Sequence, residues 1–289
     1  MSRDAFMDYL PAEERKKMLE ERMALTDEDF LAMDDTEFRA RVRERGHHTL
    51  EIQMYHAAYR GEKLSSKQAD YAKRLLRLWD QKGLSRDLPE YRYVSFLIAS
   101  ADRLAQGLPV DLTPFRPAPV TEEEKASFFR IVKERRSVRE FKDIDVPDEK
   151  INEVLEAGLW AAHGCNVQSI RYIVEHEPGL FRGSDVPGGP VHLVILQDMR
   201  CYRVNSFTPR RNQLLDAGAA GQNIVLAAHA AGLEGVWLTF NAEMSRRLEE
   251  RFQLPEYIRL VTYVNVGYGD QTPCPPYRQS VGEAVLARV

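Results

Sequence analysis

The sequence predicts an α+β fold in which a small, mainly antiparallel sheet is covered by helices and preceded by an all-helical region. Before the linker, apolar residues recur at helical spacing and show no strand-like alternation. Four prolines then fall between Pro109 and Pro119, too many for a helix or a central strand. After the prolines, β-rich runs alternate with amphipathic segments, which predicts both strands and helices. We therefore divide the chain into a helical region (1–107), a Pro-rich linker (108–120) and an α+β domain (121–289).

Helices in the first region are placed by their caps and by the spacing of apolar residues. Thr26 precedes three acidic residues, a pattern typical of a helix start. Gly46 and Gly61 each follow a periodic segment, and glycine commonly ends a helix in the left-handed conformation. The expected helices cover residues 11–25, a segment from Thr26, 35–45, 49–59, 66–79 and 89–105.

In the α+β domain, Thr121 and Glu124 have capping-box spacing, which predicts a helix to about residue 135. Asp145 is the expected cap of the next helix. The later long helix is rich in alanine and glycine, so neighbouring elements can approach it closely. The remaining expected elements are helices at 147–162 and 214–231 and strands at 171–175, 190–197, 234–239 and 259–267.

Composition excludes several classes of protein. Hydrophobic residues make up 44% and charged residues 29%, which is typical of a globular chain. The net charge of −4 is spread over both halves, so no basic region suits nucleic acid. No run approaches the roughly 20 apolar residues of a membrane span. The N-terminus lacks a signal-peptide pattern, and three cysteines cannot form a disulfide framework. We expect a cytoplasmic protein with a small-molecule substrate.

The densest cluster of candidate functional residues follows the helix that starts near Thr121. It comprises Arg135, Arg136, Ser137 and Arg139. Forked guanidinium donors with a hydroxyl suit a phosphate dianion. Arginines also gather at helix C-termini because the helix dipole favours them there. From spacing alone, both interpretations stay open.

A second cluster follows the helix at 147–162 and contains His163, Gly164, Cys165, Asn166 and Gln168. Its amides could meet a polar heterocycle, although glycine and asparagine are also common in ordinary turns. A nucleophile built from the thiol and the histidine is disfavoured, because side chains two residues apart seldom face each other.

A third segment runs from Gly267 through a proline-stiffened loop to Arg278. Together the three segments resemble the nitroreductase-like FMN-dependent oxidoreductases over about residues 125–289. Residues 135–141 look like that family's flavin-phosphate motif, and 162–168 are similar to its loop before the first strand. Residues 216–237 look like its central helix and following strand.

The resemblance implies bound FMN and a homodimer with the flavin at the interface. It assigns Arg135, Ser137 and Arg139 to the phosphate and ribityl chain, with Arg136 adjacent and Arg278 approaching from the C-terminal side. The partner subunit would place His163, Gly164 and Asn166 against the flavin. The strand end Trp237, Leu238 and Thr239 would lie near the isoalloxazine. The resemblance implies no metal and names no catalytic side chain.

The implied activity is transfer of a hydride from NADH or NADPH through FMN to an electron-poor acceptor, such as a nitroaromatic, quinone, enone or halophenol. The loop departs from the family at Ala162, His163, Ser169 and Ile170, which leaves the acceptor open. The alternative is a flavin-binding protein that consumes, stores or senses flavin without a separate substrate.

The first 110 residues lie outside the resemblance. They could cover the active site, wrap around a partner subunit or bind another protein. Within them, His47, His48, Glu51 and His56 invite a metal hypothesis, but the Glu-x-x-His pattern of di-iron helices is missing here. We therefore predict no metal site.

Overall fold

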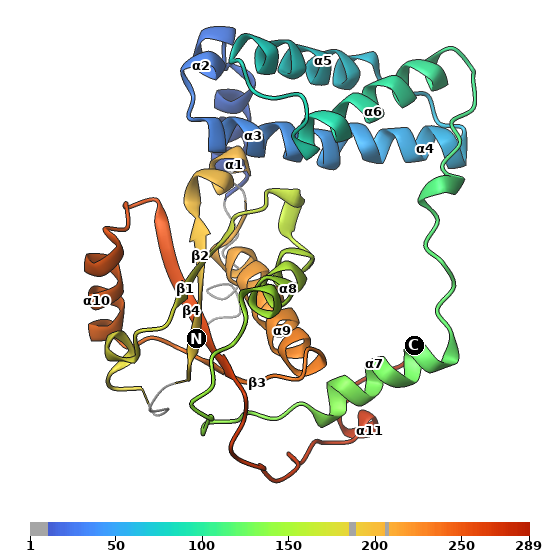
Figure 1. Cartoon of the computed structure of the whole chain (residues 1–289). Helices are drawn as coiled ribbons and strands as arrows, with labels where there is room; N and C mark the ends of the chain where they lie inside the picture. The colour runs from blue at the N-terminus through green and yellow to red at the C-terminus, as the bar shows by residue number, and fades with distance from the viewer. Residues whose placement is uncertain (1–10, 185–188, 206–207) are drawn as a thin grey trace.

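The computed structural model describes residues 11–184, 189–205 and 208–289. It has a helical region at one end and a helix-covered sheet at the other (Figure 1). Residues 1–10 of the predicted helical region fall outside the described part. Within the described part, we find no helix that combines the length and apolar character needed to cross a membrane.

After α1 (Ala12–Met23), the next helices enclose one apolar core. They are α2 (Asp27–Ala32), α3 (Asp35–Arg45), α4 (Ile52–Arg60), α5 (Ser66–Gln81) and α6 (Pro89–Ala105). Phe30, Phe38 and Trp79 are fully buried at its centre. The cap predicted at Thr26 is confirmed, since its side chain and that of Asp29 form a capping box.

Gly46 caps α3 as predicted, but in the right-handed conformation, with φ −58° and ψ −57°. The chain continues from α3 through a π-helical segment, η2 (Gly46–Glu51), directly into α4. A Cβ at position 46 would lie 2.8 Å from Val94 Cγ2, so glycine here permits close approach of α6. Gly61, in contrast, does end α4 in the left-handed conformation, at φ 67°.

The sheet contains β1 (Ile170–Glu175), β2 (Val191–Asp198), β3 (Glu234–Leu238) and β4 (Ile258–Gly267). Its order is β1-β2-β4-β3, and every pairing is antiparallel, so the predicted small antiparallel sheet is confirmed. A register shift lies between Ile195 and Leu196 of β2.

Helices cover both faces of this sheet, as the sequence predicted. On one face α8 (Asp148–Leu159) and α9 (Arg210–Ala230) pack on Leu193 and Ile195. On the other, α10 (Ala242–Phe252) and the short helix η5 (Pro178–Phe181) pack on Val194 and Leu196. The prediction that Asp145 caps α8 is wrong, because Pro147 occupies the N-cap position.

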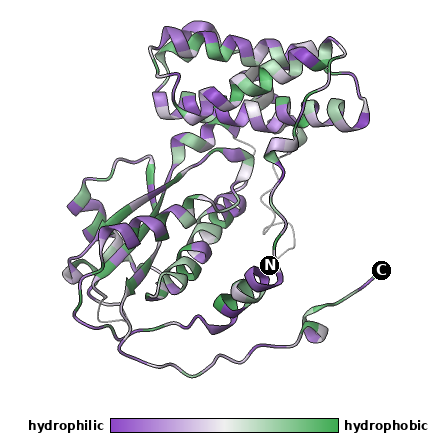
Figure 2. Cartoon of the chain, turned by 45° about the vertical axis from the view of Figure 1, so that its right-hand side comes forward, coloured by the Kyte–Doolittle hydropathy of each residue, from purple (hydrophilic) through white to green (hydrophobic). Residues whose placement is uncertain are grey.

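Helix α7 (Glu122–Glu134) and the C-terminal helix α11 (Val281–Ala284) stand away from the sheet (Figure 2). The proline-rich segment with the short helix η3 (Thr113–Phe115) leads from α6 to α7. The capping box predicted for Thr121 and Glu124 is confirmed. Along α7, Phe128, Phe129 and Val132 are exposed.

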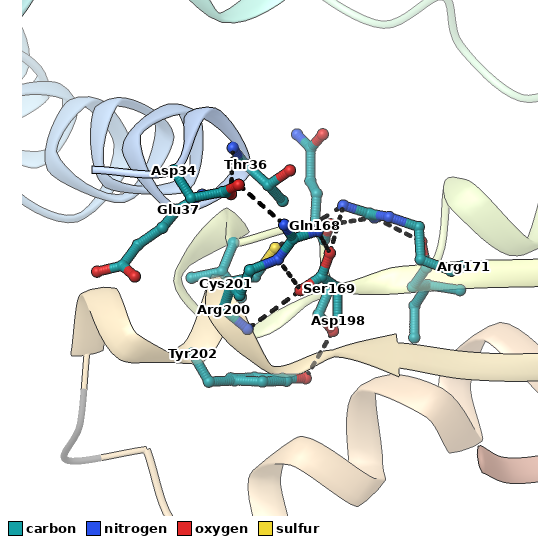
Figure 3. Close-up of polar contacts among 12 residues, drawn as sticks. Asp34, Thr36, Glu37, Gln168, Ser169, Arg171, Asp198, Arg200, Cys201 and Tyr202 are labelled. Atoms are coloured by element: carbon teal, nitrogen blue, oxygen red, sulfur yellow. Dashed lines mark hydrogen bonds and ion pairs between the residues drawn. The ribbon is translucent and has the colours of Figure 1, made fainter. Parts of the chain in front are cut away.

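The helical region contacts the sheet region through α3 and η6 (Met199–Asn205) (Figure 3). Arg200 donates to Asp34 of the helical region at 3.0 Å and to the buried Asp198 at 2.7 Å. Its guanidinium lies 3.9 Å from the ring centroid of Tyr257. Ala40 of α3 packs into a shared apolar cluster with Val167, Cys201, Tyr202 and Val204.

Candidate functional site

The segment after α7 is fixed between the start of β3 and the chain that follows β4. Ser137 forms a parallel bridge with Gly235, and the N–H of Val138 donates to the Gly235 carbonyl at 3.3 Å. Phe141 forms an antiparallel bridge with Gly269. These backbone contacts hold the C-terminal end of α7 beside the last segment of the chain.

The positive charge of Arg278, in the segment after β4, affects the pKa of Arg135, in the segment after α7. Arg135 directly follows α7 and is partly buried. Burial, and then the positive charges of Arg278 and Arg136, lower the pKa of Arg135, while Glu234 opposes the effect. Guanidinium groups that disfavour each other's charge are stabilised by a nearby anion. The pair can therefore hold a compact dianion such as a phosphate.

The neighbouring residues of this cluster have different partners. Arg136 donates to the carbonyls of Lys133 and Arg135 at 2.7 and 3.0 Å, which fits the helix-end interpretation. The backbone N–H of Arg139 donates to the Gln271 side chain at 3.0 Å, and its exposed guanidinium lies 3.4 Å from the Ser137 carbonyl. Arg139 thus ties the cluster to the segment that leads to Arg278.

Strand β3 leads from this arginine cluster toward a half-exposed tryptophan. Trp237 is two residues, about 7 Å, along the strand from Gly235. Its indole N–H donates to Thr262 Oγ1 at 2.6 Å, and its ring lies against Gly221 of α9. Leu238 and Thr239 follow at the strand end. The arrangement places an aromatic surface near the arginines.

The loop between α8 and β1 has a strained backbone. Cys165, Asn166 and Gln168 have φ values of 51°, 52° and 54°, in the left-handed region that cysteine and glutamine seldom adopt. Such strain persists only where surrounding contacts over-determine the conformation. This loop lies toward the helical region, whereas the arginine cluster lies at α7 (Figure 1).

A buried polar network supplies part of that restraint. Asp216 of α9 accepts the Gly164 N–H at 2.9 Å and the Tyr202 hydroxyl at 2.6 Å. His163 lies between Asp216, 3.3 Å from its Nδ1, and the Ser169 N–H, which donates to its Nε2 at 3.1 Å. This geometry places the proton on Nδ1. Burial lowers the pKa of His163 despite the nearby Asp216 carboxylate, so the imidazole is neutral.

Cys165 and His163, the two residues of the disfavoured nucleophile hypothesis, contact different neighbours. Cys165 Sγ lies 3.9 Å from Nδ1 of His48 and accepts from Asn205 Nδ2 at 3.4 Å. His163 instead points into its network with Ser169 and Asp216. The geometry favours a structural role for both side chains.

The helical region supplies the rest of the restraint through a buried arginine. Arg43 of α3 donates to the Val167 carbonyl at 2.9 Å and to the Glu90 carboxylate at 3.0 Å. Arg43 is 6% exposed and Glu90 5%. Burial raises the pKa of Glu90, but the Arg39 hydrogen bond and the charge of Arg43 outweigh it and lower the pKa overall. The strained loop is thus held from outside the sheet region.

The model of the nitroreductase family matches residues 132–182 and 179–268, which include the arginine cluster, the strained loop and the whole sheet. This part of the chain, just under half of its length, is similar to the nitroreductase family. The match places the oxidoreductase fold after the linker, and the helical region lies outside it.

Individual relatives agree in extent. A Methanothermobacter thermautotrophicus protein assigned the name NADH dehydrogenase/NAD(P)H nitroreductase is 28% identical over 162 residues, covering 52% of this chain and 81% of the relative. An NADPH-flavin oxidoreductase of Vibrio harveyi is 27% identical, covering 48% and 64%. A nitroreductase of Desulfovibrio desulfuricans, solved in complex with FMN, has 28% identity and a TM-score of 0.49, covering 56% of this chain and 96% of that one.

Sequence reasoning missed the residues that hold the loop of the nitroreductase-family domain. Asp216 carried a signal, because it is the one acidic residue of α9, a helix rich in alanine and glycine. Tyr202 and Arg43 carried none, since their partners are far away in sequence. The resemblance assigned Arg135 and Arg278 to one phosphate site, and the positive charge of Arg278 is one of the causes that lower the pKa of Arg135.

Lowering the pH should destabilise the protein through its buried histidines. Burial lowers the pKa of both His163 and His192 in the folded state. The unfolded chain therefore binds more protons as pH falls through about 6.5, the ordinary histidine value. Each histidine can reduce the free energy of unfolding by at most about 1.4 kcal/mol per pH unit.

Urea unfolding between pH 8 and 5.5 measures this effect. A free energy that stays constant over the range would contradict the assignment of neutral buried imidazoles.

Proposed function

We propose that the chain is an FMN-dependent oxidoreductase that transfers a hydride from NADH or NADPH to an electron-poor organic acceptor such as a nitroaromatic, quinone, enone or halophenol. The observation that carries this proposal is the setting of Arg135, which lies near the start of β3 and has a pKa lowered by burial and then by the positive charge of Arg278. The flavin names of the relatives point the same way.

The residues of the cluster fit the phosphate end of FMN. A phosphomonoester carries about −1.5 to −2 charges near neutral pH, which the two arginines would offset. Arg135 and Arg278 would hold the phosphate, and Ser137 and Arg139 would bind it or the ribityl chain. Trp237, with Leu238 and Thr239, would lie near the ring system. When bound, FMN supplies the hydride chemistry, and the protein binds and orients.

We propose that the protein works as a homodimer. The chain exposes 17988 Å², whereas a compact monomer of 33.2 kDa exposes about 12,600 Å². Exposed apolar side chains gather on the segments that stand away from the body, namely Phe128, Phe129, Val132, Tyr277, Val281 and Leu286. A second copy would cover them. It would also bring its own loop, with His163, Gly164 and Asn166, to the flavin of this copy.

We also propose that residues 1–107, 108–120 and 121–289 act as helical region, linker and flavin domain. The contacts of Arg43 and Arg200 support a helical region that serves the active site. A cytoplasmic location is consistent with three cysteines that are free thiols.

The visible absorbance of the purified protein, before and after anaerobic addition of NADH or NADPH, tests the proposal. We expect flavin bands that bleach with one of the two reductants. Bands that persist would favour a protein that stores, senses or consumes flavin. A colourless protein that also ignores added FMN would overturn the cofactor assignment.

A further inference from the structure

A cavity of about 920 Å³ lies in the helical region, outside the matched family domain. Tyr55 and Tyr59 of α4, Phe96 of α6 and Phe115 of η3 line it. Tyr59 is 73% exposed and Phe115 65%, so both rings present area that no neighbouring side chain covers. The rings form two pairs, with centroids 6.3 Å apart for the tyrosines and 5.1 Å for the phenylalanines.

This aromatic cavity adjoins a second one of about 780 Å³ that the strained loop lines. Glu51 and Tyr93 border both cavities, and the second also contains Trp160 and Asn166. Trp160 is 82% exposed. A ligand could therefore extend from the loop of the flavin domain into the helical region.

Glu51, at the junction of the two cavities, has several polar partners. The Glu51 carboxylate lies 2.6 Å from His47 Nδ1 and accepts the Tyr55 hydroxyl at 3.0 Å. Burial, and then Glu51, raise the pKa of Tyr93, whose phenol also hydrogen-bonds this carboxylate. These contacts fix Glu51 at the floor of the passage.

The shape and lining indicate the class of ligand. Cavities of about 300–1,000 Å³ hold drug-sized molecules. The combined volume of two adjoining cavities is therefore larger than a ligand with a single ring needs. Exposed aromatic faces around one hollow are unusual on a protein surface and mark a binding site. Flat rings gain stacking energy against such faces beyond the burial of area.

We propose that the helical region extends the acceptor site and binds the distal rings of a flat, multi-ring aromatic acceptor. The reacting end would lie by Asn166, and the outer rings would lie between Tyr59 and Phe115. This binding site depends on the proposed function only because we call its ligand an acceptor. The role of the first 110 residues is then to select the substrate.

Binding of non-reducible azaarenes tests the site without any redox step. Pyridine, quinoline and acridine contain one, two and three fused rings and are uncharged at pH 8. Calorimetric titration of the full-length protein should show affinity rising at least fivefold with each added ring. Equal affinity for pyridine and acridine would overturn the proposal.

Two exposed substitutions locate the binding. Tyr59→Leu and Phe115→Leu keep apolar volume but remove the rings, and each should weaken acridine binding at least fivefold while leaving pyridine unchanged. Leu31→Ala is the control, since Leu31 is 38% exposed and lies outside both cavities. Unchanged acridine binding in both variants would overturn the proposal. The proposal would also be overturned if the wild type did not bind acridine and the two variants lost the dimer in light scattering. A second copy of the chain would then fill the cavity.

A kinetic experiment on the same variants separates this proposal from the proposed function. Flavin reduction by NADPH should be unaffected by Tyr59→Leu, whereas KM should rise for naphthoquinone and stay the same for benzoquinone. If the flavin is not reduced in the wild type, the oxidoreductase proposal fails and the azaarene series still decides the site. Equal rises in KM for both quinones would contradict a distal-ring site.

Discussion

Replacing Arg135 and Arg278 together with alanine should weaken FMN binding at least about a hundredfold. A hydrogen bond to a charged group contributes about 1.5–3 kcal/mol, and about 1.4 kcal/mol changes a dissociation constant tenfold. Losing two such partners of one phosphate therefore costs at least two powers of ten. Titration of flavin fluorescence with the apoprotein measures the change.

The same double variant should be no less stable than the wild-type apoprotein. Burial, and then the positive charges of Arg278 and Arg136, lower the pKa of Arg135, so its charge is disfavoured when no anion is bound. Arg130→Ala with Arg246→Ala is the matched control, because both side chains are 60% exposed and each pairs with a glutamate one turn away. If the control lost FMN to the same extent, or if the double variant purified yellow, the phosphate site would be wrong.

Local signals in the sequence were sufficient for most of the fold. The capping box at Thr121 and the apolar run of β2 each depend on residues close together in the sequence, so both elements could be predicted. The right-handed conformation of Gly46 was not predicted because glycine has two uses, and the sequence cannot distinguish a left-handed helix end from close approach of another helix. Only the position of Val94 against Gly46 decides between them.

The candidate site also combines residues with a local sequence signal and residues that only the fold brings together. The arginines near residue 135 form a dense local motif, and the resemblance added Arg278. The network around His163 depends on Asp216 and Tyr202, which come from separate elements and meet only in the folded chain. A histidine in a loop predicts a ligand contact and an internal hydrogen bond equally well. The internal hydrogen bonds of His163 are seen only in the folded structure.

The first 110 residues gave three open alternatives, and the contacts bear on them. Buried hydrogen bonds and an apolar cluster join α3 to the strained loop, so this region does more than cover the flavin domain from outside. Deleting it would remove Ala40 from its contact with Val167 and take away the donor to the Val167 carbonyl. A separable lid would leave the loop unchanged, and hydrogen exchange of residues 163–169 distinguishes the two roles.

Arg43→Met should lower the free energy of unfolding by about 3–5 kcal/mol, the cost of removing one member of a buried ion pair. Met preserves much of the buried volume, so the effect is chiefly electrostatic. Glu90 would keep only Arg39, and the Val167 carbonyl would lose its donor. Urea unfolding measures the loss, and the amides of residues 163–169 should exchange faster.

Two further variants distinguish a lost pair from lost packing. Arg39→Met removes the outer partner of Glu90, whose side chain is 36% exposed, and should cost no more than about 1 kcal/mol. Adding Glu90→Gln to Arg43→Met removes the uncompensated charge, so the double variant should be less destabilised than the sum of the two single changes. Strict additivity would mean that Arg43 acts through packing alone. Recovered stability with a loop that still exchanges quickly would show that the Val167 contact, rather than the ion pair, maintains the strained conformation.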